Sequence, residues 1–429
     1  MTLIDRLLPI FSPNRVRYRC YPTQCDRGAY ENAVALYVDQ VRKLPEVVGI
    51  GRYGNVSIPG ISDIDLVVVT EEDISSSSAS QLSIANLPDF ERNLFMHEAS
   101  VMPIGGLGHL SEHLDVSIVE TVWGAVPPVP SLPDEDRQWQ EIAILVEWLG
   151  CFCRFFGEIS TSRVANVRWA LPVLHSLRYT AQIARKYVSN APQEWEAYSA
   201  TVADLRASWF DISTDDERAE RLSVSLAEGW MITTDICCRV ERWIEAEGLL
   251  PSLSSERGWR IYTYEPARFA MVLDSSTPEE MIERLLKIAG IDESAQPAGL
   301  KIISRLAPSW CLLPKSHDAF AMAAAASAPT VDKHIAGQWF GGQRIQPMKP
   351  ATPFERYLCG RFKRLEAQAR FLETNVVGFG AVCSDLVYAP PAPEESSDSW
   401  RRRLLLAAQK GWGQTRAKAC ASGVRCVGA

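Results

Sequence analysis

The chain has 429 residues, of which 47 % are hydrophobic and 22 % are charged, and its formal net charge is −8. This composition is typical of a soluble globular protein and excludes a largely disordered chain, a collagen-like repeat or a small disulfide-stapled domain. The length predicts two or three domains. Apolar runs such as residues 66–69 and 321–326 are far shorter than the roughly 20 residues that cross a bilayer, so no transmembrane helix is expected.

The charges are unevenly distributed along the chain. The residues after Asp398 include basic side chains but no acidic ones, so the preceding part is more acidic than the net charge implies. An acidic body repels a long phosphate backbone, which counts against a polymerase that acts on long nucleic acid. The basic tail, residues 400–429, is expected either to contact RNA or an anionic surface or to be a poorly ordered end.

Cysteine and histidine spacings indicate no redox or zinc site. None of the 11 cysteines forms a C-x-x-C pair, and a cytosolic protein with reduced, mostly buried thiols is the simplest interpretation. His109 and His113 are four residues apart, but they follow a glycine-rich segment that predicts a loop. The first residues include Asp5 and Arg6 and lack the apolar core of a signal peptide, so the expected location is the cytoplasm.

The first patterned segment combines a helix with two strands. Apolar residues at helical spacing predict a helix over residues 30–44, which Pro45 ends. Residues 47–53 predict a strand that leads into glycines, and residues 64–69 predict a second strand. Between them, residues 54–62 form a turn rich in Gly, Pro and Ser.

The next segment ends at a proline-rich boundary. Residues 71–88 are polar and predict a surface loop, residues 89–100 predict a short helix, and residues 114–119 predict another strand. Four prolines follow that neither a helix nor a central strand would tolerate: Pro127, Pro128, Pro130 and Pro133. We therefore expect a first domain over residues 1–126.

Longer helical patterns follow and define a second domain, residues 134–250. Pro172 is expected to kink or split the second of the four helices, which are predicted at residues 136–157, 162–188, 193–209 and 215–247.

The rest of the chain has a mixed pattern. Residues 259–390 predict a smaller mixed α/β region, with a strand at 269–273 and helices at 278–288 and near 353–374. Residues 391–429 are the linker and the basic tail. The whole is expected to be an α+β protein, with a mixed sheet and flanking helices at its N-terminal end.

Two carboxylates precede the second strand of the first domain. Because side chains alternate along a strand, Asp63 and Asp65 share one face while Ile64 and Leu66 point into a core. The two negative charges repel each other, and a divalent cation between them would relieve this repulsion. Their hard oxygen ligands suit Mg²⁺ or Mn²⁺. The alternative is an Asp-x-Asp pair on a surface turn without a function.

A third carboxylate, Asp115, lies in the predicted strand 114–119. If that strand lies beside the first pair, Asp115 converges on Asp63 and Asp65. Three such carboxylates can hold two metal ions about 3.5–4 Å apart, an arrangement used for phosphoryl and nucleotidyl transfer.

The glycine-rich turn suits a phosphate group. Gly54 lets the backbone turn sharply, and exposed N–H groups in such a turn bind anions. Asn55 and Ser62 add polar side chains, and Arg52 adds a positive charge. The chain has neither a Walker motif nor a G-x-G-x-x-G motif here, which excludes a P-loop or Rossmann interpretation of this segment.

The order Gly54-Asn55, then Ser62-Asp63-Ile64-Asp65-Leu66, then Leu114-Asp115-Val116 resembles the nucleotidyltransferase superfamily that shares the DNA polymerase β palm. That family has a hydrophobic residue, Gly, then Gly or Ser, a spacer, Asp-hydrophobic-Asp/Glu, and later a third acid. The resemblance covers about residues 30–125.

The chain departs from the family pattern at one position. Asn55 stands where the family has Gly or Ser, and the alternative alignment, Gly51 followed by Arg52, gives a more usual spacer. We prefer Gly54 and Asn55 because the asparagine side chain can donate to a phosphate oxygen.

The resemblance also implies roles for the acids. Asp63 and Asp65 would bind both metal ions, and Asp115 would bind one and help to deprotonate an acceptor hydroxyl. In similar enzymes a helical domain closes over the nucleotide, which implies that Arg178 and Arg185 contact the triphosphate. The alternative for these two arginines is a solvated helix face.

The resemblance therefore implies a metal-dependent nucleotidyltransferase that moves a nucleoside monophosphate from an NTP to a hydroxyl-type acceptor and releases pyrophosphate. The acidic body favours a compact acceptor, although a small molecule, a nucleotide, an RNA end and a protein side chain all remain open. The alternative is a palm-derived scaffold that binds a nucleotide or RNA without catalysis.

Overall fold

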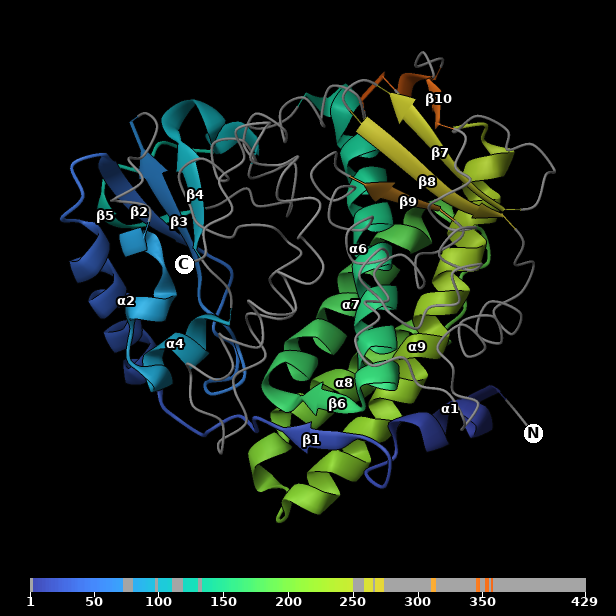
Figure 1. Ribbon diagram of the computed structural model, residues 1–429, viewed down its shortest axis with the longest axis horizontal. Coiled ribbons are helices and arrows are strands. Elements are labelled where there is room, and N and C mark those ends of the chain that lie inside the picture. Colours follow the sequence, from blue (N-terminus) through green and yellow to red (C-terminus); the bar gives the residue numbers. More distant parts are fainter. Residues whose placement is uncertain are drawn as a thin grey trace, which may run out of the picture. The chain divides into compact units, whose positions relative to one another are not determined.

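The computed structural model describes residues 3–71, 80–96, 99–109, 119–129, 133–249, 258–264, 267–273, 310–313, 345–347, 352–354 and 356–357. The fold is α+β, and the described chain divides into two compact units (Figure 1). The sheet unit comprises residues 22–140, and the helical unit comprises residues 1–21 and 141–360. The helical unit thus includes the first 21 residues, which the sequence analysis placed in the first domain. Each unit is described by itself below.

The sheet unit contains a four-stranded mixed sheet in the order β4-β3-β2-β5. Strand β2 is antiparallel to both β3 and β5, whereas β3 and β4 are parallel. The predicted strands at 47–53 and 64–69 are confirmed by β2 and β3. The elements are α2 (Arg27–Val41), β2 (Val47–Tyr53), β3 (Asp65–Thr70), α4 (Asp89–Phe95), β4 (Ser100–Pro103) and β5 (Glu120–Gly124), with 3₁₀ turns at Ser80–Leu82, Ile84–Asn86 and Ile104–His109.

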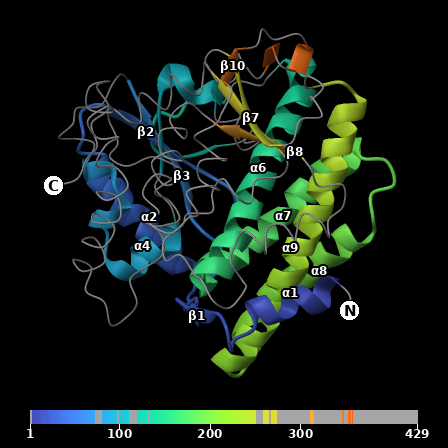
Figure 2. The ribbon, with the colours of Figure 1, turned by 45° about the vertical axis from the view of Figure 1, so that its right-hand side comes forward.

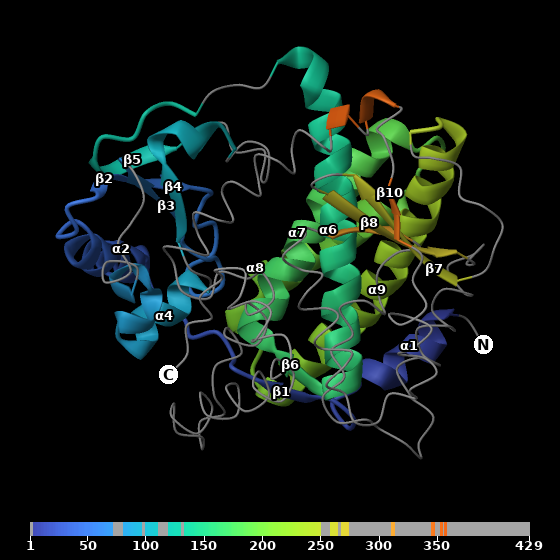
Figure 3. The ribbon, with the colours of Figure 1, turned by 45° about the horizontal axis from the view of Figure 1, so that its top comes forward.

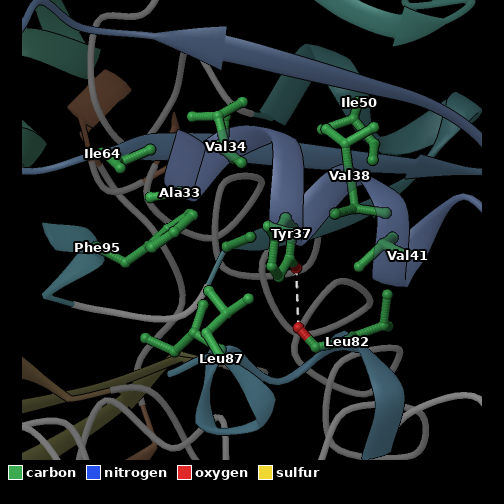
Figure 4. Close-up of a cluster of buried hydrophobic side chains, with 14 of the residues drawn as sticks. Ala33, Val34, Tyr37, Val38, Val41, Ile50, Ile64, Leu82, Leu87 and Phe95 are labelled. Carbon is green, nitrogen blue, oxygen red and sulfur yellow. Dashed lines mark hydrogen bonds between the residues drawn. The ribbon is translucent and has the colours of Figure 1, made fainter. Parts of the chain in front are cut away.

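One face of this sheet packs against α2 and α4 (Figure 3). Ile50, Leu66 and Val68 are fully buried and meet the apolar side of α2, where Tyr37 is also fully buried (Figure 4). Asp26 caps the start of α2 by accepting a hydrogen bond from the backbone N–H of Ala29. The alternating pattern of β3 therefore places its even-numbered residues in the main core, as the sequence predicts.

The opposite face has a smaller core. Tyr53, Val67, Val69, Met102 and Leu107 form this cluster, in which the 3₁₀ turn after β4 covers the sheet. Because Asp65 alternates with Leu66, it lies on the same face as Val67.

Two expectations for the sheet unit are corrected. The predicted surface loop at 71–88 contributes Leu82, Ile84 and Leu87 to the core, because its few apolar residues are spaced to reach α2. The hydroxyl of Tyr37 donates to the carbonyl of Leu82 at 2.8 Å (Figure 4). The helix predicted at 89–100 is shorter and ends at Phe95, since Met96 adopts a φ of 61°.

The strand predicted at 114–119 is not tested by the described residues. Strand β5 begins at Glu120, one residue after the predicted strand 114–119 ends. Of that predicted strand, only Val119 lies within the described residues, so the placement of Asp115 stays a prediction.

The helical unit confirms the four predicted long helices. Pro172 lies within α7 without splitting it: the residues on either side are held in the core, with Leu171 and Leu174 buried. The helices are α6 (Asp134–Ser162, whose first turns belong to the sheet unit), α7 (Val167–Tyr187), α8 (Glu194–Ala207) and α9 (Asp215–Ala246), with a 3₁₀ turn at Trp209–Asp211.

The N-terminal segment joins this unit through apolar packing. Helix α1 (Leu3–Phe11) packs against α9 (Figure 2). The ring of Phe11 meets that of Trp230 edge-on, with 5.6 Å between the ring centroids. Strand β1 (Arg17–Arg19) pairs in parallel with β6 (Val164–Asn166). Neither α1 nor this ribbon was predicted.

A further sheet in the helical unit confirms the strand predicted at 269–273. Its order is β10-β7-β8-β9, with β7 (Gly258–Tyr264), β8 (Ala267–Leu273), β9 (Trp310–Leu313) and β10 (Ile345–Pro347). The predicted helix at 278–288, most of the one near 353–374 and the basic tail lie outside the described residues. No helix among the described residues is long and apolar enough to cross a membrane.

The close approach of β2 and β5 gives the first testable prediction. A Cβ atom at Gly49 would lie 2.2 Å from the backbone oxygen of Ala125, so Gly49→Ala forces the two strands apart. We expect this change to lower the free energy of unfolding by about 1–3 kcal/mol in denaturant titrations. The control is Gly105→Ala, where a Cβ atom would meet no atom within 4 Å. Equal stability of the two variants would contradict the strand pairing.

Candidate functional site

Strand β2 ends, and strands β3 and β4 begin, at the same end of the four-stranded sheet. Strand β2 ends at Tyr53, directly opposite Asp65, where β3 begins. Strand β4 begins at Ser100, which is paired with Val67. The predicted acids Asp63 and Asp65 therefore lie at the end of the sheet where β2 leads into the glycine-rich turn.

The two acids alternate with core residues. Asp63 and Asp65 are partly exposed, whereas Ile64 and Leu66 are at most 2 % exposed. The backbone N–H of Ile64 donates to the carbonyl of Leu94 at 3.0 Å, which ties the residue between the two acids to α4. This anchoring fixes the main chain from which both carboxylates project.

A residue that the sequence analysis missed, Tyr53, lies near the two carboxylates, since it is paired with Asp65 across the strands. Its hydroxyl lies 3.3 Å from the Oγ of Ser100. Burial, together with the negative charges of Asp65 and Asp63, raises the pKa of Tyr53 well above its usual value, against a smaller opposing effect of the hydrogen bond with Ser100. Both carboxylates thus act on the same phenol, which stays protonated at neutral pH. An aromatic residue directly before the turn glycine was the available sequence signal.

The turn lies close against one carboxylate at Gly54. This residue has a φ of 76°, which side chains other than glycine adopt with strain. A Cβ atom at Gly54 would lie 2.8 Å from the Oδ2 atom of Asp65. Asn55, the next residue, is exposed, and its carbonyl accepts a hydrogen bond from the N–H of Ser57 at 3.0 Å. The chain thus passes directly over the carboxylate and leaves the asparagine side chain accessible.

Ser62 helps to hold the turn together. It is 3 % exposed, and its Oγ atom accepts a hydrogen bond from the N–H of Ile58 at 3.0 Å. Its hydroxyl is also 3.3 Å from that of Ser57. The predicted contact of Ser62 with phosphate therefore competes with a hydrogen-bonding role inside the turn.

Tyr30 of α2 holds the same turn through two hydrogen bonds. Its hydroxyl donates to the carbonyl of Ser62 at 2.5 Å and accepts from the N–H of Gly60 at 3.0 Å. Tyr30 is 1 % exposed, so both hydrogen bonds lie in the core. The turn before Asp63 is thus attached to the helix that covers the sheet.

Arg52 is engaged by two carboxylates. Its guanidinium pairs with Glu120 and Glu31, each at 2.9 Å. The hydrogen bonds to Glu120 and Glu31 raise the pKa of Arg52 further. A contact of Arg52 with phosphate would require this side chain to leave a partner on α2 or β5.

The other predicted residues lie elsewhere. Asp115 falls outside the described residues, and within those residues no three His, Cys, Asp or Glu side chains are grouped to hold a metal ion. Arg178 and Arg185 are on α7 of the helical unit, where Arg185 pairs with Glu196. Their contact with a nucleotide stays a prediction.

Removal of the Tyr30 hydroxyl tests how the turn is held. Tyr30→Phe leaves two buried backbone groups without this partner, so we expect a loss of about 1–3 kcal/mol in the free energy of unfolding. Faster amide hydrogen exchange at Gly60 should accompany it. The matched control is Tyr37→Phe, because that buried hydroxyl serves Leu82 instead. Equal exchange at Gly60 in both variants would refute the role of Tyr30.

Comparisons with known proteins add no relative. No family model matches the chain, and neither the curated proteins nor the solved structures yield a match.

Proposed function

We propose that the sheet unit is a nucleotidyltransferase palm that moves a nucleoside monophosphate from an NTP to a hydroxyl-type acceptor and releases pyrophosphate. One observation carries the proposal. Asp63 and Asp65 lie at the start of β3, where Asp65 is paired with Tyr53 at the end of β2, beside a turn whose backbone at Gly54 lies against Asp65. Paired carboxylates next to a glycine turn suit a metal ion together with a phosphate chain.

The donor set fits Mg²⁺ or Mn²⁺. Carboxylate oxygens are hard ligands, and Asp63 and Asp65 would hold the ions, with Asp115 as the third ligand. Asp115 precedes Glu120 by five residues, and Glu120 is paired with Arg52 at this edge of the sheet. When bound, such ions neutralise charge on the phosphate and on the attacking and leaving oxygens.

The chain's own groups position the nucleotide. The turn after Gly54 offers backbone N–H groups and the exposed Asn55 to phosphate oxygens. Asp115 would accept the proton of the acceptor hydroxyl, and Arg178 and Arg185 would contact the triphosphate. We further propose a compact acceptor and a cytoplasmic location.

Replacement of the acids tests the proposal directly. We expect Asp63→Asn and Asp65→Asn each to lower Mn²⁺-dependent pyrophosphate release from NTPs by about a hundredfold or more. Each change replaces a charged metal ligand with a neutral amide of nearly the same shape. Asp115→Asn should have a similar effect. The control is Asp89→Asn, since that exposed carboxylate pairs with Arg92 on α4.

The same variants distinguish the scaffold alternative. If wild type and Asp63→Asn show the same background release with all four NTPs while both still bind nucleotide, the chain is a non-catalytic scaffold and the proposed transfer is wrong. Mn²⁺ binding measured without nucleotide separates loss of the ion from loss of a later step.

The variant Gly54→Ala tests whether the close approach of the turn to Asp65 matters for metal binding. Gly54→Ala puts a methyl group against the Oδ2 atom of Asp65, so we expect weaker Mn²⁺ binding and lower activity, by about tenfold or more. Gly248→Ala is the matched control: its φ is 60°, yet a Cβ atom there meets no atom within 4 Å. Both changes strain the backbone, so an equal effect on Mn²⁺ binding would mean that the contact with Asp65 is irrelevant.

A further inference from the structure

The two-stranded ribbon formed by β1 and β6 in the helical unit joins two stretches of sequence that contain no acidic residue. Strand β1 carries Arg17 and Arg19, and no Asp or Glu occurs over residues 6–25. Strand β6 belongs to residues 159–193, which also lack Asp and Glu. The parallel pairing of the strands places these stretches side by side in a chain whose net charge is −8 (Figure 1). The ribbon is therefore a local basic surface on an acidic protein.

The two arginines lie on the outer face of this ribbon. Side chains alternate along a strand, so Arg17 and Arg19 share one face and Tyr18 lies on the other. The hydroxyl of Tyr18 donates to the carbonyl of Phe11 at 2.5 Å, and Ala165, which is paired with Tyr18, is fully buried. The face of Tyr18 is therefore the inner one, whereas Arg17 is exposed and Arg19 is half-buried.

The guanidinium groups of the ribbon have no acidic partner among the described residues. The Nε atom of Arg19 is buried and has no hydrogen-bond partner there. Other arginines of the same unit do have carboxylate partners, since Arg218 pairs with Asp215 and Arg239 pairs with Asp235. Buried polar atoms in folded proteins nearly always have a partner, so the ribbon retains charge and donor capacity for a ligand.

The outer edge of β1 also leaves backbone groups open. The N–H of Arg17 donates to the carbonyl of Arg163, directly before β6, at 2.8 Å. In a parallel pair the next residue directs its backbone groups to the opposite side, so the N–H and C=O of Tyr18 face away from β6. The ribbon has only two strands, and no other described element packs extensively against β1. An open strand edge of this kind can accept an extended chain as a further strand.

We propose that the outer edge of β1 binds an extended acidic segment of a partner protein, which adds a third strand to the ribbon. The backbone of the segment would pair with the N–H and C=O of Tyr18. Residues opposite Arg17 and Arg19 on the added strand are two positions apart and lie on the face of the arginines. The arginines therefore select Asp or Glu at alternate positions of the segment. This inference does not depend on nucleotide transfer.

The surroundings of the ribbon favour a short peptide over RNA. The hydroxyl of Tyr21 donates to the carbonyl of Asp215 at 3.2 Å, which places the acidic first turn of α9 beside the chain two residues after Arg19. Those acidic side chains repel a phosphate backbone that continues past the ribbon. RNA draws its affinity from many phosphate contacts and cannot continue a strand ladder.

The test compares two peptides that differ only in the order of their residues. Thr-Glu-Thr-Glu-Thr-Glu-Thr places its glutamates on one face of a strand, whereas Thr-Thr-Glu-Glu-Glu-Thr-Thr has the same composition and charge without that alternation. Each is titrated into the ¹⁵N-labelled full-length chain, and the backbone amide of Tyr18 is observed. We expect the alternating peptide to bind about tenfold more tightly and to shift the Tyr18 amide, because this N–H gains an acceptor.

Two double variants locate the interaction. Arg17→Gln combined with Arg19→Gln should weaken binding of the alternating peptide about ten- to a hundredfold, as expected for loss of charged hydrogen bonds. The control combines Arg27→Gln with Lys43→Gln, which changes the charge equally at exposed residues of the sheet unit. It should leave the affinity within about threefold.

A backbone-modified peptide tests strand addition itself. An alternating peptide that is N-methylated at its central residues keeps its charges but loses backbone donors, so it should bind more weakly than the unmodified peptide.

Four results would overturn the proposal. They are the absence of a Tyr18 shift with both peptides, equal affinity of the two peptides, equal weakening in the two double variants, and unchanged binding after N-methylation. Tighter binding of oligouridylate than of the alternating peptide at Tyr18 would assign the surface to RNA and likewise refute the acidic segment. The comparison of peptides on the wild-type chain decides even if the arginine variant fails to fold.

Discussion

The register between β2 and β3 is the constraint on which the candidate site depends. Because the strands are antiparallel with Tyr53 opposite Asp65, the end of one strand and the start of the next meet at one edge of the sheet. A shift by one residue would turn Asp65 into the main core and Leu66 out of it. The burial of Leu66 and Val68 against α2 makes that shift costly, so apolar packing on one face fixes the acids on the other.

Two side chains at the end of β2, Tyr53 and Arg52, lie directly before the turn that leads to the acids. Tyr53 is buried beside them and its raised pKa keeps the phenol neutral, so it offers polarity without positive charge. Arg52, one residue before Tyr53, directs its charge to Glu31 and Glu120. The two side chains that precede the turn are therefore both held by partners within the sheet unit, Tyr53 by Ser100 and Arg52 by the two glutamates.

The sequence predicted the features that depend on residues close together in the chain, and it missed those that depend on residues far apart in the chain. The strands at β2 and β3 and the long helices have strong local periodicity, and the alternation that places Asp63 and Asp65 opposite Leu66 is equally local. The roles of Tyr30 and Tyr53 depend on partners 32 and 47 residues away in sequence, Ser62 and Ser100, and no local pattern specifies them. The short strand β4 was missed because four residues carry too little periodicity to separate it from the helix before it.

The partners of the arginines could not be predicted from the sequence either. In the sequence, Arg52, Arg178 and Arg185 are equivalent candidates for a phosphate contact. In the structure, Arg52 and Arg185 have carboxylate partners that lie far away in the chain or on another helix, whereas the guanidinium of Arg178 donates to the hydroxyl of Tyr179 and lies over its ring. Tertiary packing therefore decides which partner each of these similar cations has, and a local sequence pattern does not specify it.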